Sequence, residues 1–191
     1  MAEHEKKVEI EGAGEVSTEN KEVAMLIAVL ALFLAIAELL GSAAQVKSVQ
    51  ANIEASNLWA FYQAKAIRAT TLETAVQQLE IDMPSVTDHK QLEAREALVK
   101  KWKGTVARYE SDPEKKEGKE QIAERAKEAE KERDLYEKKH TRFELAVGAF
   151  HIAIVLASAA IITGIALLVY GSGILGFIGL INLLGGRLIG G

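Results

Sequence analysis

Two apolar stretches decide the fold of this chain: VAMLIAVLALFLAIAELLGSAA, residues 23–44, and FELAVGAFHIAIVLASAAIITGIALLVY, residues 143–170. The first contains one charged residue, Glu38, and the second contains Glu144 and His151 as its ionisable groups. About 20 consecutive apolar residues form a helix that matches the roughly 30 Å hydrocarbon core of a bilayer. Each stretch therefore predicts a transmembrane helix, at 22–44 and 143–170, and we expect an all-α integral membrane protein.

The residues outside these stretches carry nearly all of the charge. Residues 45–142 have 18 acidic and 19 basic side chains, and residues 1–22 have seven glutamates against three lysines. Such a balance provides no basic field for nucleic acid, and aromatic residues, at 6%, are too sparse for base stacking. The chain has no cysteine, which excludes disulfides, thiolate metal sites and cysteine nucleophiles.

Basic residues beside the spans predict the orientation in the membrane. Lys47 follows the first span, and Lys138, Lys139 and Arg142 precede the second. The positive-inside rule therefore places residues 45–142 in the cytoplasm and an acidic tail, residues 1–21, on the other side.

The segment 171–191 is apolar and rich in glycine. Gly171-Ser172-Gly173 predicts a turn, and the apolar run that follows, 174–184, is shorter than an ordinary span. A short transmembrane helix would bring Arg187 to the cytoplasmic side, whereas a re-entrant segment would not cross; both remain open. We expect the glycines to permit close helix packing. They are Gly173, Gly176, Gly179, Gly185, Gly186, Gly190 and Gly191.

The cytoplasmic region predicts three helices, at about 45–83, 88–110 and 114–142. The first continues the first span without a break and ends at Pro84, and Asp88 is a suitable N-cap for the second. One seam with 3-4 spacing runs along the first helix. It consists of Leu58, Tyr62, Lys65, Ala69, Leu72, Val76, Leu79 and Met83, and a second apolar stripe consists of Val46, Val49, Ile53, Ala60 and Ile67.

Helix lengths then suggest an arrangement. At 1.5 Å per residue the first cytoplasmic helix reaches roughly 58 Å from the membrane and the third starts about 43 Å from it, while the middle helix is about 33 Å long. We therefore expect a coiled-coil-like stalk with the middle helix lying across its end as a transverse cap. Trp102 and Tyr109 on this cap, and the surplus stripe, predict a homo-oligomer.

The string NLWAFYQAKAIR, residues 57–68, resembles the signature of a bacterial membrane-protein family, the domain of unknown function numbered 4337. Its matching residues are Trp59, Tyr62, Gln63, Ala64, Lys65, Ile67 and Arg68. The resemblance extends to the whole layout of the chain and implies a bacterial inner-membrane protein, but it brings no activity.

The same string places aromatic and hydrogen-bonding side chains on one helix face. Trp59, Tyr62 and Gln63 are spaced i, i+3 and i+4, and Lys65 and Arg68 adjoin them. They begin roughly 22 Å beyond the membrane end, too far for an interfacial aromatic belt. We interpret them mainly as helix-packing residues at an oligomer or partner interface; a ligand or lipid-headgroup site is the alternative.

Three polar residues of the apolar segments form a second candidate site. Measured from the cytoplasmic ends of their spans, Glu38 lies about 9 Å and His151 about 12 Å deep. Ionisable residues inside a membrane normally pair or line a cavity. We therefore expect Glu38 and His151 to face the bundle interior as a polar clasp or a proton or cation site, with Asn182 as a possible third member.

Catalytic motifs are absent from the sequence. It has no phosphate-binding glycine loop, GxSxG or HExxH, and its four histidines lack metal-ligand spacing. We expect no enzyme, cofactor or metal. Two functions remain: a structural or scaffolding homo-oligomer in contact with membrane lipid and with unknown protein partners, or a subunit of an ion or proton channel or transporter.

Overall fold

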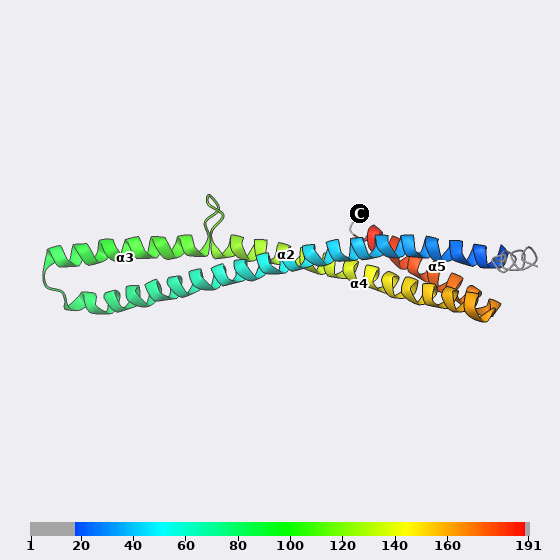
Figure 1. Cartoon of the computed structure of the whole chain (residues 1–191). Helices are drawn as coiled ribbons and strands as arrows, with labels where there is room; N and C mark the ends of the chain where they lie inside the picture. Colours follow the sequence, from blue (N-terminus) through cyan, green and yellow to red (C-terminus); the bar gives the residue numbers. More distant parts are fainter. Residues whose placement is uncertain (1–17, 190–191) are drawn as a thin grey trace, which may run out of the picture. The chain divides into compact units, whose positions relative to one another are not determined.

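The computed structural model describes residues 18–189, and every regular element among them is a helix. They are α2 (Thr18–Asp82), the short 3-10 helix η1 (Met83–Ser85), α3 (His89–Glu110), α4 (Lys119–Thr163) and α5 (Ala166–Leu188), as Figure 1 shows. Most of the predicted acidic tail, residues 1–17, lies outside the described residues, and its last residues belong to α2. The all-α prediction is confirmed for the described part of the chain.

Local sequence explains where the first helices begin and end. The first apolar stretch and the segment after it form one helix of 65 residues, α2, whose end is followed by Pro84 in η1. Asp88 caps α3, because its carboxylate accepts a hydrogen bond of 2.9 Å from the backbone N–H of Lys90. Proline has no backbone N–H and fits only into the first turn of a helix, so α2 ends before Pro84. At the start of α3, the aspartate accepts a hydrogen bond from one of the N–H groups that have no partner within the helix.

The chain divides into two compact units. Unit 1 contains residues up to Gln45 together with those from Glu137 onward, and unit 2 contains Val46–Tyr136. Helices α2 and α4 each contribute a part to both units. Each unit packs around its own interior.

Unit 1 contains the membrane candidates. Helices α2, α4 and α5 each include an apolar window long enough to cross a bilayer. The break between the last two differs from the predicted turn at 171–173: α4 ends at Thr163, and Gly164 has a φ of +68°. Only glycine adopts this left-handed conformation readily, and the Gly164 N–H closes the helix on the Ala160 carbonyl. The last helix is therefore 23 residues long and passes straight through 171–173.

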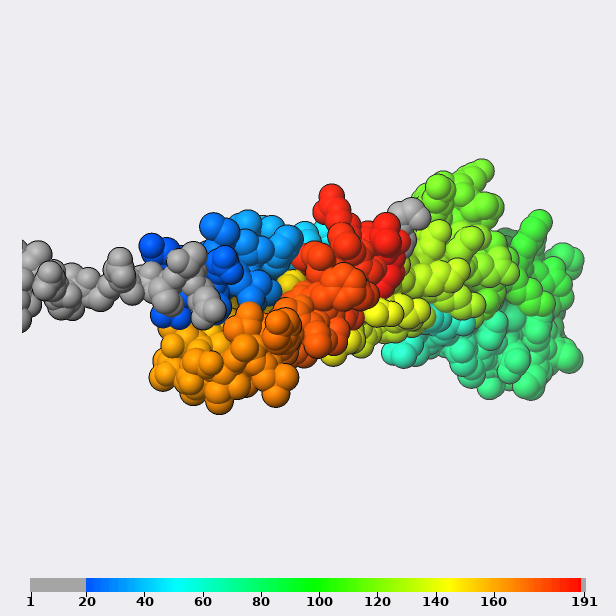
Figure 2. Space-filling model, turned by 90° about the vertical axis from the view of Figure 1, so that its right-hand side faces the viewer, coloured from blue at the N-terminus to red at the C-terminus, as the bar shows by residue number. Residues whose placement is uncertain are grey.

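Small residues let the three helices of unit 1 approach closely. Figure 2 shows α5, orange to red, against α2 in blue and α4 in yellow to orange. A Cβ atom added to Gly176 would lie 2.7 Å from Leu30, and one added to Gly179 would lie 2.8 Å from the Phe150 ring. Gly186 is equally tight against Phe143. The expectation that glycines permit close packing is met at these three, whereas Gly173 and Gly185 face open space.

Unit 2 is an antiparallel assembly of helices in which α3 lies along α2 (Figure 1). Lys103 Nζ of α3 lies 2.7 Å from Glu80 of α2, and Tyr109, further along α3, reaches back to Lys65. The expected transverse cap is therefore wrong. It followed from starting the third helix at residue 114, which left too little length for α3 to run back along α2.

Residues 111–118 leave the helical stack as a loop, visible in Figure 1 as a projection between α3 and α4. Helix α4 begins at Lys119, five residues later than the sequence predicted, so its start lies about 7.5 Å further along α2. Asp112 accepts a hydrogen bond from the Lys115 N–H, and Lys116 has a φ of 55°. The side-chain hydrogen bond and the positive φ hold a turn where helix was expected.

Candidate functional site

The string of residues 57–68 lies where three parts of unit 2 meet: α2, the end of α3 with its loop, and the start of α4. We call this site the junction; its residues are Trp59, Tyr62, Lys65, Tyr109, Glu110, Glu117, Lys119 and Glu130. It adjoins an apolar cluster of Ala55, Leu58, Ile122, Ala126 and Ala129. Trp59 and Tyr62 of α2, spaced i and i+3, pack against this cluster, whereas Gln63, at i+4, is exposed.

Trp59 connects α2 to α4. Its indole Nε1–H donates a hydrogen bond of 2.9 Å to the carboxylate of Glu130. Its ring meets the Tyr62 ring edge to face, with centroids 5.6 Å apart. The indole thus packs on the apolar cluster while its single polar atom is satisfied by a charged acceptor.

Lys65 is the buried charged residue of the junction, with 6% of its surface exposed. Its Nζ lies 3.7 Å from Glu117 of the loop, 5.0 Å from the centroid of the Phe61 ring and 5.7 Å from that of Tyr109. A desolvated ammonium group needs an opposite charge or an aromatic face. Both are provided here by α2, α3 and the loop of the same chain.

Lys119 joins the first residue of α4 to the last residue of α3. Its Nζ lies 2.6 Å from Glu110 and 5.8 Å from the centroid of the Tyr62 ring. The hydrogen bond to Glu110 raises the pKa of Lys119 above its ordinary 10.5, against the opposing effect of partial burial. This ion pair fastens the two ends of the loop.

The base of the loop is closed by residues that the sequence analysis did not single out. The Gln121 side chain accepts from the Asp112 N–H at 3.1 Å and donates to Ser111 Oγ at 3.1 Å. Gly118 is buried beneath them, and a Cβ added there would collide with Gln121 and with the Asp112 backbone. A glycine at the end of a charged, Pro-containing segment was the signal for this closure.

The other predicted interface residues are divided between exposed and half-buried positions. Gln63 and Arg68 are exposed, and Trp102 is half-buried on α3. By contrast, Trp59, Tyr62, Lys65 and Tyr109 all have partners within the chain. These four therefore join α2 to α3, the loop or α4 of the same chain, and their role at an oligomer or partner interface stays a prediction.

In unit 1, Glu38 and His151 lie side by side. His151 Nε2 is 3.7 Å from Glu38 Oε1, so the two residues stand at the same level of α2 and α4. Their side chains are 54% and 56% exposed, which corrects the expectation that they face the bundle interior. The interior is filled instead by apolar residues such as Leu30, Phe150 and Leu183.

Asn182 does not join this pair. Its amide donates to the Ile178 carbonyl of α5 at 3.0 Å, and its oxygen lies 3.4 Å from Arg142 Nη1. Another histidine, His140, has Nδ1 at 3.1 Å from the Gly41 carbonyl oxygen and Nε2 at 3.9 Å from Glu144. The polar residues of unit 1 therefore bridge neighbouring helices in pairs instead of forming one cluster.

The chemistry available at these sites is that of ion pairs and hydrogen bonds. Among residues 18–189, no group of three or more metal-ligating side chains comes together. At the junction each lysine faces a carboxylate and aromatic rings, an arrangement that fixes helices relative to one another. In unit 1, His151 Nε2 and Glu38 Oε1 lie 3.7 Å apart, close enough for an ion pair between helices.

The chain belongs to the family described as Domain of unknown function (DUF4337), which it matches over residues 19–189. The match covers both units and nearly all of the described residues. No curated protein and no solved structure matches the chain.

Proposed function

We propose that this protein is a membrane-embedded homo-oligomer with a structural or scaffolding role. In this proposal unit 1 spans a bacterial inner membrane with α2, α4 and α5, and unit 2 extends into the cytoplasm as a helical assembly that organises copies of the chain or a protein partner. We assign it no catalytic step and no cofactor.

The carrying observation is a surplus of exposed apolar side chains in unit 2, where a membrane would not cover them. Val46, Val49, Ile53, Ile67 and Ile81 are each more than half exposed on α2. Contiguous apolar patches of this kind mark interaction sites in soluble regions. Self-association would cover them.

The exposed surface of unit 1 supports the membrane half of the proposal. Large apolar residues are exposed on all three candidate spans, for example Leu39, Val155 and Phe177. Lipid tails cover such side chains without cost. Arg142 directly precedes the second span. Arg187 lies at the same end of unit 1, because Arg142 contacts Asn182 and Phe143 contacts Gly186 of α5. The positive-inside rule then favours that end as cytoplasmic.

The oligomer is tested by measuring the mass of the full chain in a mild detergent and in lipid nanodiscs. We expect at least two copies per particle in both, with a mass that holds on tenfold dilution. A strictly monomeric mass in both environments would overturn the proposal.

One observation favours a channel or transporter subunit as a second candidate. Glu38 and His151 are half exposed on the outer surface of unit 1, at positions inside the predicted spans. Ionisable groups at such depth normally face protein or water. In an oligomer they would line the contact between copies, where a proton or cation path would need them.

Glu38→Gln separates the two candidates, because glutamine keeps the size and polarity of the side chain and removes its charge. Proton flux is measured in vesicles of phosphatidylethanolamine and phosphatidylglycerol containing the full chain, with Glu144→Gln as the control. Flux that is present in the parent and lost in Glu38→Gln supports a conducting role. Absence of flux from the parent protein, with the oligomer intact, leaves the scaffold.

A further inference from the structure

Residues on the exposed face of α2 in unit 2 are spaced alternately three and four positions apart. We call these positions the α2 seam: Val46, Val49, Ile53, Ser56, Ala60, Gln63, Ile67, Thr70, Thr74, Gln77 and Ile81. All eleven are exposed, and none is charged. The residues that α2 buries against its own chain, such as Ala55, Leu58 and Ala69, occupy the opposite face. Alternating steps of three and four residues keep the seam on one side of the helix over five heptads.

The absence of charge on the seam is specific to this face. Over residues 46–82, α2 carries seven charged residues, and all of them lie off the seam. In the neighbouring part of α4, residues 119–136, all eight exposed residues are charged. A helix face that remains in water is normally charged, as this face of α4 is, whereas depletion of charge marks the centre of an interface. The α2 seam therefore has the composition of a covered surface.

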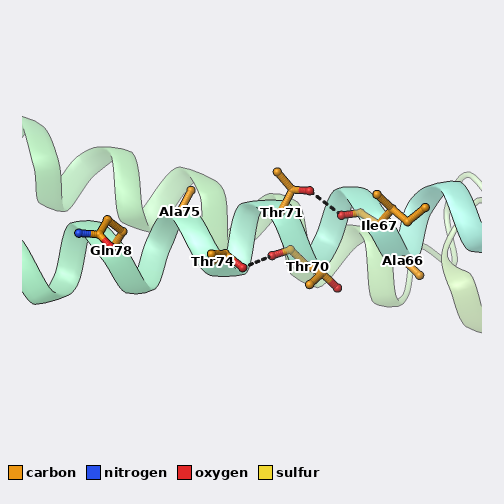
Figure 3. Close-up of a pocket in the computed structure, with 7 residues that line it drawn as sticks. All are labelled: Ala66, Ile67, Thr70, Thr71, Thr74, Ala75 and Gln78. Atoms are coloured by element: carbon orange, nitrogen blue, oxygen red, sulfur yellow. Dashed lines mark hydrogen bonds between the residues drawn. The ribbon is translucent and has the colours of Figure 1, made fainter.

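The α2 seam also includes an open surface pocket, the hollow, which a single helix lines. Its volume is about 710 Å³, and its lining residues all come from α2. Figure 3 shows them along the helix: Ala66, Ile67, Thr70, Thr71, Thr74, Ala75 and Gln78. The Thr71 and Thr74 hydroxyls donate to the Ile67 and Thr70 carbonyls at 2.8 and 2.9 Å. Because these two donors are satisfied within the helix, apolar side chains can cover them without leaving the Thr71 and Thr74 hydroxyl hydrogens unpaired.

We propose that the α2 seam forms a parallel, in-register, two-stranded coiled coil with the α2 seam of a second copy of the chain. This inference rests on the proposed membrane-embedded homo-oligomer. Copies that enter one membrane with the same topology point their α2 helices in the same direction, so contact between those helices is parallel. The small and apolar residues of one seam then fill the hollow of the other.

Residue types along the seam set the number of strands and the register. Alternate positions are mostly β-branched: Val46, Ile53, Ile67, Thr74 and Ile81. Valine and isoleucine at one of the two alternating sets of positions are compatible with a parallel two-stranded coiled coil. Gln63 and Gln77 occupy the other set of positions, and an amide is both donor and acceptor. Each glutamine can therefore form hydrogen bonds with the same glutamine of the second copy. Only the in-register arrangement allows this at both Gln63 and Gln77.

The flanks of the seam are also suited to an identical partner. The residues beside it are uncharged from Gln50 to Thr71, so no charge pattern selects a different chain. The first flanking charge is Glu73. The 3-4 spacing can be followed in the sequence back through Ser42 and Leu39, but lipid would account for exposure there; the argument therefore uses residues 46–81 alone.

Single-cysteine variants of the full chain test the arrangement, because the chain has no cysteine of its own. Ser56→Cys, Gln63→Cys and Thr70→Cys lie on the seam, and Glu54→Cys and Arg68→Cys are exposed controls off it. Each variant is oxidised in mild detergent, and the disulfide-linked dimer is followed on non-reducing gels. Helix content and particle mass of every variant are measured beforehand.

In a parallel coiled coil equivalent seam residues have Cα atoms about 6 Å apart, within disulfide range, so all three seam variants should cross-link about tenfold faster than the controls. An antiparallel pair brings equivalent residues together at one level only, so cross-linking of Gln63→Cys without Ser56→Cys and Thr70→Cys would overturn the inference. Equal rates on and off the seam in a particle that keeps its oligomeric mass would also overturn it and leave the homo-oligomer standing. A monomeric mass would remove the proposed function itself.

Discussion

The two units solve the same problem, packing helix on helix, with different residues. In unit 1 the helices touch through alanine and glycine, with the Phe143 and Phe150 rings resting on Gly186 and Gly179. In unit 2 alanines such as Ala55 and Ala126 also lie at the contacts, beside Leu58 and Ile122. Aromatic residues and ion pairs join them, of which Trp59 with Glu130 and Lys65 with Glu117 are examples.

We attribute the difference to the surroundings proposed for each unit, a membrane for unit 1 and water for unit 2. Lipid is as apolar as the side chains themselves, so helices in a membrane associate through close van der Waals contact, which small residues allow. In water the burial of apolar surface drives association, and charged groups at its rim add specific pairings. Unit 1 should therefore be sensitive to added volume, and unit 2 to the loss of aromatic and charged partners.

The largest effect is expected for Gly179→Leu in unit 1. A Cβ atom at this position already lies 2.8 Å from the Phe150 ring, so a leucine must push α5 away from α4. We expect a loss of about 3 kcal/mol or more, at the upper end of the range for overpacking. Thermal unfolding in detergent, followed by circular dichroism, measures it. Gly173→Leu is the matched control: its Cβ meets nothing within 4 Å, and equal losses in both variants would show that the close approach is unimportant.

In unit 2 the corresponding experiment is Trp59→Phe, which keeps an aromatic ring and removes the donor to Glu130. Hydrogen bonds to charged groups contribute about 1.5–3 kcal/mol, and Glu130 is only half-buried, so we expect a loss near 1.5 kcal/mol. Trp102→Phe serves as the control, since its indole has no hydrogen-bond partner among the described residues. Equal unfolding midpoints for Trp59→Phe and Trp102→Phe would show that unit 2 does not depend on this charged partner.

A smaller effect is expected for Lys119→Met, which removes the ion pair with Glu110. Because Glu110 is about half exposed, we expect a cost of about 1 kcal/mol or less. The pKa of Lys119 is raised in the folded protein, so its stabilising contribution is complete below pH 10.5 and is lost as the pH rises through the higher folded value. The difference in unfolding midpoint between parent and variant should thus be constant from pH 7 to about 10 and shrink above that.

Lys103→Met provides the control for this pair. Lys103 also faces a carboxylate, Glu80, at 2.7 Å, but both side chains are largely exposed. Water screens such a pair, so its removal should leave the midpoint nearly unchanged. If Lys103→Met were as costly as Lys119→Met, the position of Lys119 between α3 and α4 would have no special role.

The smallest effect, and one of opposite sign, is expected for Ser172→Ala. Ser172 is completely buried on α5, and its Oγ has no hydrogen-bond partner among residues 18–189. Removing an unpaired buried hydroxyl should stabilise unit 1 by up to about 1 kcal/mol. Ser158→Ala, whose hydroxyl donates to the Ile154 carbonyl at 2.8 Å, should show no gain. A loss of stability in Ser172→Ala would show that this hydroxyl is paired in the folded protein.

Sequence patterns were informative wherever a local rule acts. The apolar windows indicated two helices able to cross a membrane and left the third segment open between a span and a re-entrant segment; the structure has three such helices. The 3-4 spacing of Leu58, Ala69 and Val76 indicated the face of α2 that is buried. Depth along each span also placed Glu38 and His151 at one level, because the rise per residue is fixed. These features depend on period and length, which the chain carries in its own order of residues.

Predictions from local sequence patterns were wrong where two nearby stretches carried the same signal for a helix break. Gly171-Ser172-Gly173 and Gly164 are both credible break points inside apolar sequence, and the break falls at Gly164. Glycine serves either a turn or a close helix contact, and the surrounding helices decide which. The sequence predicted a break after residue 110, but residues 114–118 of the loop were predicted as helix, since their charged residues suit a helix and the closure of the loop depends on Gln121.

The sequence by itself determined that this protein is helical, that two of its segments can cross a membrane while a third is apolar, and which face of the first long helix is buried. Only the tertiary structure decided what covers that face: that α3 returns along α2, that Trp59 and Lys65 find their partners in α4 and the loop, and that the Glu38–His151 pair points outward. Periodicity fixes the direction in which a side chain points relative to its helix axis. The partner it meets depends on the ends, turns and residue volumes of segments far away in the chain, which no local pattern encodes.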